Sequence, residues 1–333
     1  MNSLIGESLP ILRYDNFIVM KILITGINGF VGSNLTKEWR GRYTLYGLDI
    51  NQTPKESVSK IFNWEELNKI PSIDAIVHLA GKAHDTKNES EAAEYFAVNT
   101  ALTQQIFDYF LKSDAEKFIF FSSVKAAAEK VQGEFLTEEV LPMPVGPYGE
   151  SKIKAEEYIL SKQELTAQQQ KKVYILRPCM IHGPGNKGNL NLLYKVVKMG
   201  MPWPLGAYKN RRSFCSIDNL SFVVEQLIVK EDISSGIYQV CDDEALSTNE
   251  LIRLINDSLG KKAMIWKLPT GLMNFAAGVC GALHLPLDKE RLRKLTENYV
   301  VSNQKIKSVL GIEKMPVSAR EGIRKTMESF KNN

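Results

Sequence analysis

The segment TGINGFVG (residues 25–32) follows the apolar stretch KILI and precedes a pattern of helical periodicity. Its glycines, Gly26, Gly29 and Gly32, stand three residues apart. Glycine here permits a tight turn, lets the backbone approach a diphosphate, and lets the helix pack closely on the sheet. The helix N-terminus then offers amide groups and a partial positive charge to phosphates. The segment therefore predicts a strand–loop–helix unit that binds a dinucleotide.

Strands and helices alternate after this loop. Short apolar strands are expected at 20–25, 43–48, 74–80, 117–122 and 173–177, with helices at 30–40, 89–112 and 148–165 between them. Continuous apolar strands are typical of a parallel sheet buried on both faces. The predicted fold class is α/β: a Rossmann fold with a doubly wound parallel sheet and a smaller C-terminal substrate-binding lobe.

The expected domain boundaries follow this alternation. We predict an N-terminal extension at 1–19 and a dinucleotide-binding domain at 20–178. The lobe is expected at 179–333, with segments around 211–240 returning to the first domain. At 333 residues the chain exceeds one ordinary core, which fits two units.

Composition excludes several classes of protein. The net charge of +4 is too small for this length to indicate a nucleic-acid partner. The four cysteines are scattered without a Cys-x-x-Cys pair, so we expect neither a metal site nor disulfides, and a cytoplasmic location. Residues 1–19 lack the apolar core of a signal peptide.

One apolar stretch, 268–287, raises the question of a membrane. Prolines bracket it and glycines interrupt it. We therefore expect a buried or lid helix rather than a membrane span, with contact at a membrane surface as the lesser alternative.

Asp49 indicates which dinucleotide binds. It ends the second predicted strand, 23 residues after Gly26. A carboxylate there can accept both ribose hydroxyls of NAD and repels the extra phosphate of NADP, so NAD is the expected cofactor. The other cofactor contacts that we predict are Asn28, Phe30 and Val31 in the glycine loop, Asn63 beside the adenine, and Leu79, Ala80 and Gly81 after the next strand. Asn99 either supports the nicotinamide side or caps a helix.

Tyr148 and Lys152 stand four residues apart in PYGESK (147–152), so they project from the same helix face. The positive charges of Lys152 and of an oxidised nicotinamide would together lower the pKa of the Tyr148 phenol. Ser122 and Ser123 end the strand KFIFFSS, where a hydroxyl can share a hydrogen bond with the substrate oxygen. This Ser–Tyr–Lys group suits the movement of a proton and a hydride between a carbinol and NAD.

At this point the chain resembles the extended short-chain dehydrogenase/reductases, in their nucleotide-sugar epimerase/dehydratase branch. The resemblance rests on TGINGFVG, Asp49, HLAG (78–81), FSS (121–123), PYGESK, RPCMIHGPG (177–185) and RRSFCSIDNL (211–220). It implies that Ser123, Tyr148 and Lys152 are catalytic, and that Lys152 also holds the nicotinamide ribose. It further implies that Arg212 grips the phosphates of a UDP or dTDP sugar.

Departures from the family pattern reduce the number of reactions that the chain is expected to catalyse. Family 4,6-dehydratases carry Asp-Glu directly after the catalytic hydroxyl, where this chain has Val124 and Lys125, so dehydration is not expected. Met180 and His182 replace the usual Asn and Tyr. SSVK and PLGAYKNRRS (204–213) look most like enzymes acting at C4 of UDP-N-acetylhexosamines in surface-polysaccharide synthesis.

Three readings of the function remain open. We expect an NAD-dependent 4-ketoreductase or, at near-equal odds, a UDP-glucose or UDP-GlcNAc 4-epimerase; a non-catalytic NAD(H)-binding sensor is the remote alternative. For the sugar nucleotide we predict contacts from Lys82, His84, Lys125, Asn189 and Arg212, and for the cofactor also Ser122 and Arg177.

A homodimer is also expected from the resemblance, through the helices that carry Asn99 and Tyr148. Its apolar seam would use Ile106, Phe107, Phe110, Ile153, Tyr158 and Ile159. The same residues could instead face the protomer's own sheet.

Overall fold

The computed structural model describes residues 19–82, 91–282 and 289–331. The predicted extension at 1–19 therefore lies almost entirely outside the described residues. Seven parallel strands form one sheet in the order β3-β2-β1-β4-β5-β6-β9. The strands are β1 (Lys21–Thr25), β2 (Thr44–Leu48), β3 (Lys60–Phe62), β4 (Ala75–His78), β5 (Lys117–Phe121), β6 (Lys172–Pro178) and β9 (Gly236–Val240).

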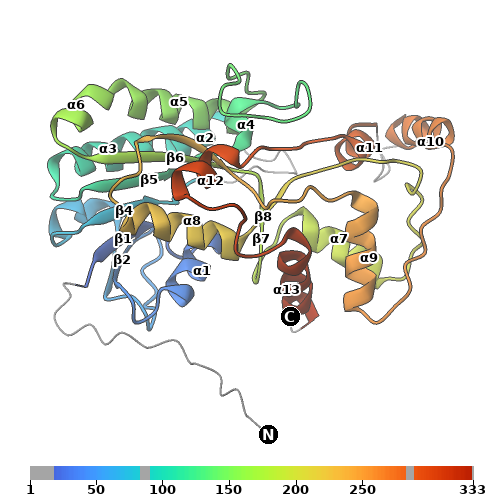
Figure 1. The fold of residues 1–333 in the computed structure, drawn as a ribbon, viewed down its shortest axis with the longest axis horizontal. Helices are drawn as coiled ribbons and strands as arrows, with labels where there is room; N and C mark the ends of the chain where they lie inside the picture. The colour runs from blue at the N-terminus through green and yellow to red at the C-terminus, as the bar shows by residue number, and fades with distance from the viewer. Residues whose placement is uncertain (1–18, 83–90, 283–288, 332–333) are drawn as a thin grey trace, which may run out of the picture.

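Helices cover both faces of this sheet (Figure 1). On one face lie α1 (Phe30–Glu38) and α8 (Ile217–Val229), which share a core with β1, β4 and β6. On the other lie α3 (Leu102–Lys112) and α5 (Pro147–Ser161), with α6 (Gln163–Gln168) beyond them. The strand order reverses between β1 and β4, and in such sheets the carboxyl ends at that point line the ligand crevice. The Rossmann architecture predicted from the sequence is therefore confirmed.

The remaining elements lie around the sheet or form the lobe. Near the sheet are η1 (Trp64–Lys69), α2 (Ala92–Tyr95), η2 (Phe96–Ala101), α4 (Val124–Ala127) and α12 (Gln304–Leu310). The lobe has its own core, built around α7 (Asn189–Lys198), α9 (Thr248–Ser258), α10 (Thr270–Ala282), α11 (Lys289–Thr296) and α13 (Ala319–Lys331). Residues 89 and 90 of the predicted helix 89–112 lie outside the described residues. The described part begins at Ala92 and is interrupted by the π-helical turn η2.

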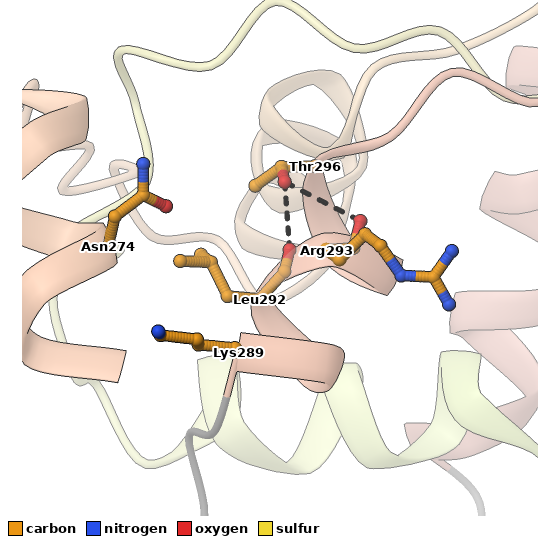
Figure 2. A pocket seen from close by; sticks show the side chains of 5 residues that line it. All are labelled: Asn274, Lys289, Leu292, Arg293 and Thr296. Atoms are coloured by element: carbon orange, nitrogen blue, oxygen red, sulfur yellow. Dashed lines mark hydrogen bonds between the residues drawn. The ribbon is translucent and has the colours of Figure 1, made fainter. Parts of the chain in front are cut away.

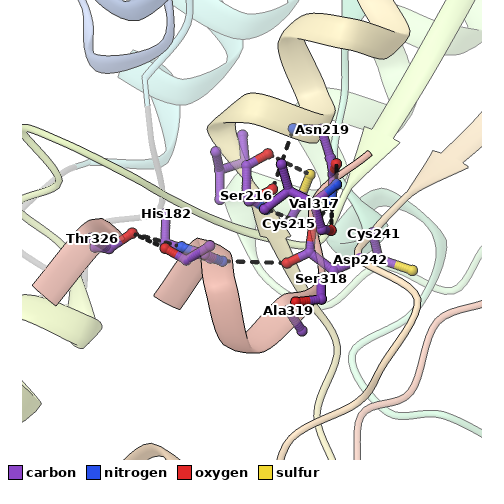
Figure 3. A network of polar contacts seen from close by, with 12 residues as sticks. His182, Cys215, Ser216, Asn219, Cys241, Asp242, Val317, Ser318, Ala319 and Thr326 are labelled. Atoms are coloured by element: carbon purple, nitrogen blue, oxygen red, sulfur yellow. Dashed lines mark hydrogen bonds and ion pairs between the residues drawn. The ribbon is translucent and has the colours of Figure 1, made fainter. Parts of the chain in front are cut away.

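A small parallel pair, β7 (Met180–His182) and β8 (Phe214–Ser216), connects the sheet to the lobe. Its polar side chains form a buried network (Figure 3). His182 Nδ1 lies 2.9 Å from Thr326 Oγ1, and Asp242 accepts hydrogen bonds from Ser216 N and Asn219 Nδ2. His182, which stands in the family's Tyr position, is therefore engaged inside the protein and fastens α13 to β7.

The predicted apolar seam of a dimer lies largely inside the protomer. Ile106, Phe107, Phe110 and Ile159 are buried in the protomer's own core against β5 and β6. These four residues therefore face the protomer's own sheet, which is the second of the two alternatives that the sequence left open. A dimer stays a prediction, but these residues cannot supply its contact.

A buried ion pair joins α5 to β6. The Arg177 guanidinium, in a residue only 1% exposed, donates to both carboxylate oxygens of Glu156, from Nε at 3.0 and 3.2 Å and from Nη2 at 2.5 Å. Ser122 Oγ donates to the same carboxylate. Because a buried charge is costly without its partner, this pair fixes the position of α5 on the sheet.

Replacing Glu156 with Gln keeps the shape of the side chain but leaves the Arg177 guanidinium buried without its counter-charge. We expect the free energy of unfolding to fall by about 3–5 kcal/mol, measured by urea denaturation. Glu157→Gln is the matched control, since Glu157 pairs with Lys154 at the exposed surface of the same helix. The control should lose less than about 1 kcal/mol, and equal losses would contradict the role given to the buried pair.

Candidate active site

The glycine loop lies directly against the end of β4. Gly26 has a φ of 67°, in the left-handed region, and its backbone N–H donates to the Leu48 carbonyl over 2.8 Å. A Cβ at Gly26 would lie 2.8 Å from the backbone N and Cα of Ala80. Real Cβ atoms do not approach backbone so closely, so both the conformation and the space require glycine.

The same loop opens α1 in a form suited to a diphosphate. Gly29 is the N-cap residue and no side chain caps the helix. A Cβ at Gly32 would lie 2.7 Å from Ile27 Cα, so the first turn can close tightly on the loop. Because no side chain caps the helix and the loop glycines leave space, the backbone amides at the start of α1 form a cradle that fits the phosphates of a dinucleotide.

Asp49 lies beside this cradle and is nearly buried. Its carboxylate accepts hydrogen bonds from Asn28 N at 3.0 Å and Asn51 N at 3.1 Å. The sequence did not single out Lys55, whose ammonium donates to the Ile27 carbonyl at 2.7 Å and to Ser33 Oγ at 3.0 Å. Burial lowers the pKa of Lys55, partly countered by the charge of Asp49. A carboxylate and an ammonium thus flank the position expected for the adenosine ribose.

The end of β4 brings the cofactor loop to the catalytic lysine. A Cβ on Gly81 would lie 3.0 Å from Asn99 Oδ1 and 3.1 Å from Lys152 Nζ. Asn99 accepts from Lys82 N at 2.7 Å and donates to Ser151 Oγ at 3.0 Å. Asn99 is therefore buried in mid-helix and joins the strand-end loop to α5, so it is not the helix cap that the sequence left open.

Ser123 and Tyr148 come together at the carboxyl end of β5. Ser123 is the N-cap of α4, where its Oγ accepts from Lys125 N, and it is hydrogen-bonded to the Tyr148 side chain. Burial raises the pKa of Tyr148, the hydrogen bond with Ser123 lowers it, and the neighbouring Tyr95 raises it further; the net shift is upward. From the sequence, a lowered pKa was expected for Tyr148 when oxidised nicotinamide is bound beside it. In the chain without cofactor the pKa is raised, so the lowered pKa stays a prediction for the complex with NAD.

Lys152 is buried one helical turn further along α5. Its ammonium donates to the Phe121 carbonyl over 2.8 Å and lies 5.0 Å from the centre of the Phe120 ring. Burial lowers the pKa of Lys152 to about 8, although the charge of Glu156 counters the shift. Its ammonium therefore lies beside Gly81, between the glycine cradle and the Ser–Tyr pair.

Two of the predicted substrate residues lie close together. Lys125 Nζ is 4.5 Å from the centre of the Tyr299 ring and pairs with Glu129 at 2.9 Å. Arg212 interacts electrostatically with Lys125 and Tyr299 and donates to the Lys294 carbonyl. Burial lowers the pKa of both Lys125 and Arg212. Two partly enclosed cations thus lie close to Ser123, because Lys125 belongs to α4 and Ser123 is the N-cap of that helix.

The other predicted contacts are more widely spread. Lys82 pairs with Glu94 and lies 5.7 Å from the Tyr95 ring, whereas Asn189 is exposed at the start of α7. Asn63 caps η1, and its backbone N–H donates to Glu66. Arg177 and Ser122 are engaged by Glu156, so their cofactor contacts remain predictions. His84 lies outside the described residues.

Besides Lys55, sequence reasoning missed two residues of the site. Tyr95 is buried, with its ring edge-on to Tyr148 at 6.2 Å, but an aromatic in an apolar helical stretch carries no signal of its own. Glu156 gave a usable signal, because it stands four residues after Lys152 on the same helix. Among residues 19–82, 91–282 and 289–331, no three His, Cys, Asp or Glu side chains gather as metal ligands.

The fold and this cradle define a dinucleotide-binding α/β protein of the Rossmann type. The model of the NAD dependent epimerase/dehydratase family matches residues 22–241. The chain belongs to that family.

Relatives and solved structures agree with this assignment. A UDP-glucose 4-epimerase of Vibrio cholerae is 30% identical, covering 95% of this chain and 97% of its own length. An N-acetyl-α-D-glucosaminyl-diphospho-undecaprenol 4-epimerase of Escherichia coli O157:H7 is 26% identical, covering 86% and 84%. The structure of MoeE5 with UDP-glucuronic acid and NAD has a TM-score of 0.71 at 20% identity, covering 94% and 99%, which shows a shared fold.

Gly26→Ala should place a methyl group against Ala80 and distort the cradle. We expect the Kd for NAD to rise at least about tenfold, measured by calorimetry, because the backbone must move several tenths of an ångström. Gly41→Ala is the matched control: Gly41 also has a positive φ, 74°, but nothing lies within 4 Å of its added Cβ. If the control weakened NAD binding as much, backbone strain alone would explain the result.

The pKa of Lys152 predicts a specific pH dependence of stability. Below pH 8 the lysine is charged in both folded and unfolded chains, and the cost of burying the charge is present in full. Between about pH 8 and 10.5 the folded chain releases its proton first, so stability should rise with pH relative to Lys152→Met. Relative to Lys152→Met, the free energy of unfolding of the wild type should rise by about 3 kcal/mol over this range, measured by urea denaturation.

Lys154→Met provides the control for this measurement, because Lys154 is exposed on the same helix. Its stability should run parallel to that of the wild type over this range. Parallel curves for wild type and Lys152→Met would contradict the burial of a charged ammonium.

Proposed function

We propose that this chain is an NAD-dependent enzyme that oxidises or reduces C4 of a UDP-linked N-acetylhexosamine. The observation that carries the proposal is the hydrogen-bonded Ser123–Tyr148 pair, with Lys152 Nζ beside Gly81 at the edge of the dinucleotide cradle. Acid–base groups and cofactor cradle thus meet at one end of the sheet, as a dehydrogenase half-reaction requires.

The chain's own residues would handle the proton. Tyr148 removes it from the C4 hydroxyl in oxidation or returns it to the C4 oxygen in reduction. Ser123 holds the oxygen in place through a shared hydrogen bond, and the charge of Lys152 favours the phenolate. NAD, when bound, exchanges a hydride with the same carbon.

A diphosphate group fits the cations on the substrate side. Lys125 and Arg212 are close enough to interact electrostatically, and both are partly buried, so their charges are screened less than at an open surface. The relatives support a UDP-sugar, since one is described as a UDP-glucose 4-epimerase and MoeE5 was solved with a UDP-sugar. Asp49 beside the cradle favours NAD over NADP.

A 4-ketoreductase and a 4-epimerase share this half-reaction. The sequence likeness of SSVK and PLGAYKNRRS favours the reductase, whereas the descriptions of the two relatives favour the epimerase. Val124 and Lys125 stand where a dehydratase needs an acid and a base, so water elimination is not proposed. We also propose a role in surface-polysaccharide precursor synthesis, a cytoplasmic location and a homodimer.

Tyr148→Phe should lower kcat by about 10²–10⁴-fold, because the reaction loses its proton donor and acceptor. The Kd for NAD should change less than about threefold, since the aromatic ring at position 148 keeps its place and only the hydroxyl is lost. Tyr158→Phe is the matched control, because Tyr158 lies on the same helix and donates to Asp108 away from the site. No turnover by the wild type, together with unchanged behaviour of Tyr148→Phe, would favour the non-catalytic sensor. Turnover that is unchanged in Tyr148→Phe would contradict the acid–base role given to Tyr148.

A panel of UDP-sugars separates the two enzymes. An epimerase converts UDP-GlcNAc and UDP-GalNAc into each other without net change in absorbance at the NADH band. A reductase consumes one NADH for each UDP-4-keto-6-deoxy-N-acetylhexosamine. Turnover of dTDP- or GDP-sugars in place of UDP-sugars would contradict the proposed nucleotide.

A further inference from the structure

Helix α10 is apolar on two opposite sides. Met273 and Ala277 are buried in the core of the lobe, whereas Leu272 (53% exposed), Phe275 (71%) and Val279 (44%) face solvent. The helix carries no charged residue. A helix on a soluble surface normally presents polar side chains to water. The stripe of Leu272, Phe275 and Val279, here called the α10 stripe, is thus suited to an apolar surrounding.

Exposed apolar side chains also precede α10. Met264 and Trp266 are each more than half exposed and stand two residues apart in a stretch that bridges to Trp203 and Leu205. Tyr208, close to that bridge, lies 3.4 Å from the Thr270 carbonyl at the start of α10. Figure 1 places α10 and α11 at the end of the lobe farthest from α6. The stripe therefore lies at an outer end of the molecule.

Positive charge accompanies this apolar surface. Residues 261–297 contain seven Lys or Arg and three Asp or Glu, an excess equal to the net charge of +4 of the entire chain. Two of the acids form ion pairs with basic residues of α11: Glu290 with Lys294, and Glu297, just after the helix, with Arg293. Apolar groups flanked by cations and a tryptophan are the composition of surfaces that lie in the headgroup region of anionic bilayers.

A hollow of about 440 Å³ separates α10 from α11 (Figure 2). It is lined by Asn274, Lys289, Leu292, Arg293 and Thr296, none of which belongs to the predicted active site. In Figure 2 the ammonium of Lys289 points toward α10, while the guanidinium of Arg293 turns the other way. A cation and an amide thus line a hollow beside the α10 stripe, and they can donate to a lipid phosphate.

We propose that the α10 stripe docks this chain on the surface of an anionic lipid bilayer. Leu272, Phe275 and Val279 would enter the acyl boundary, and Lys267 and Lys289 would contact headgroup phosphates. The charge argues against a second copy as the partner, because a two-fold contact would bring two surfaces of equal positive charge together. In the described residues no helix is long and apolar enough to span the bilayer. The proposal does not depend on the proposed function.

Co-sedimentation with vesicles tests this docking. The full chain should sediment with vesicles of phosphatidylcholine containing about a third phosphatidylglycerol and remain in solution with pure phosphatidylcholine. Phe275→Ser combined with Val279→Ser should lower the partition coefficient at least about tenfold. Lys267→Glu combined with Lys289→Glu should give a similar loss without removing apolar surface.

Leu165→Ser is the matched control, because Leu165 is also exposed but lies on α6, at the other end of the molecule. It should bind anionic vesicles like the wild type. Absence of wild-type binding, or equal binding by wild type and the Phe275/Val279 variant, overturns the proposal. It is also overturned if light scattering shows a wild-type dimer that this variant abolishes, since the stripe then belongs to a second copy. NADH turnover with UDP-4-keto sugars, measured without lipid, reports separately on the proposed function.

Discussion

The approach of Gly26 to Ala80 is the contact on which the rest of the site depends. It lies where the strand order reverses, so the connections that leave β1 and β4 run to opposite faces of the sheet and a crevice forms outside the strand ends. Because a Cβ at Gly26 would lie 2.8 Å from the Ala80 backbone, the loop can close only with glycine. That closure directs the start of α1 toward the crevice and sets Gly81 beside Lys152. Cofactor cradle and acid–base group are thereby held at a fixed spacing.

Burial governs the electrostatics of the reacting centre. In the free chain, burial raises the pKa of Tyr148 and lowers the pKa of Lys152. The charge of Lys152 alone therefore does not bring the pKa of Tyr148 below its usual value. The same burial makes the site responsive to an added charge, because a charge in a low-dielectric setting acts more strongly than in water. An oxidised nicotinamide bound at this site would add a positive charge near Tyr148, and that charge would lower the pKa of the phenol. Glu156 and Arg177 keep α5 in place beneath this pair.

The sequence predicted the sheet and the central residues because both depend on local patterns. Each of these patterns can be recognised within a few residues: the apolar strands, the glycine spacing and the Tyr148–Lys152 interval. Contacts between segments that are distant in the sequence could not be predicted from such local patterns. Nothing in the sequence indicates that Lys55 returns to the Ile27 carbonyl, or that Phe107 faces the sheet rather than a partner. The orientation of α10 was equally hidden, since an apolar run has no period that separates its buried side from its exposed side.

Under the proposed function, hydride and proton are transferred at C4 of a UDP-linked hexosamine. The most direct measurement is to reduce a UDP-4-keto-hexosamine with NADH that carries deuterium at both hydrogen positions of the nicotinamide C4, and to locate the label in the sugar by NMR. This half-reaction is common to a reductase and an epimerase. A single deuterium at C4 of the hexose is expected. A product labelled at another carbon, or one reduced without label, would contradict it.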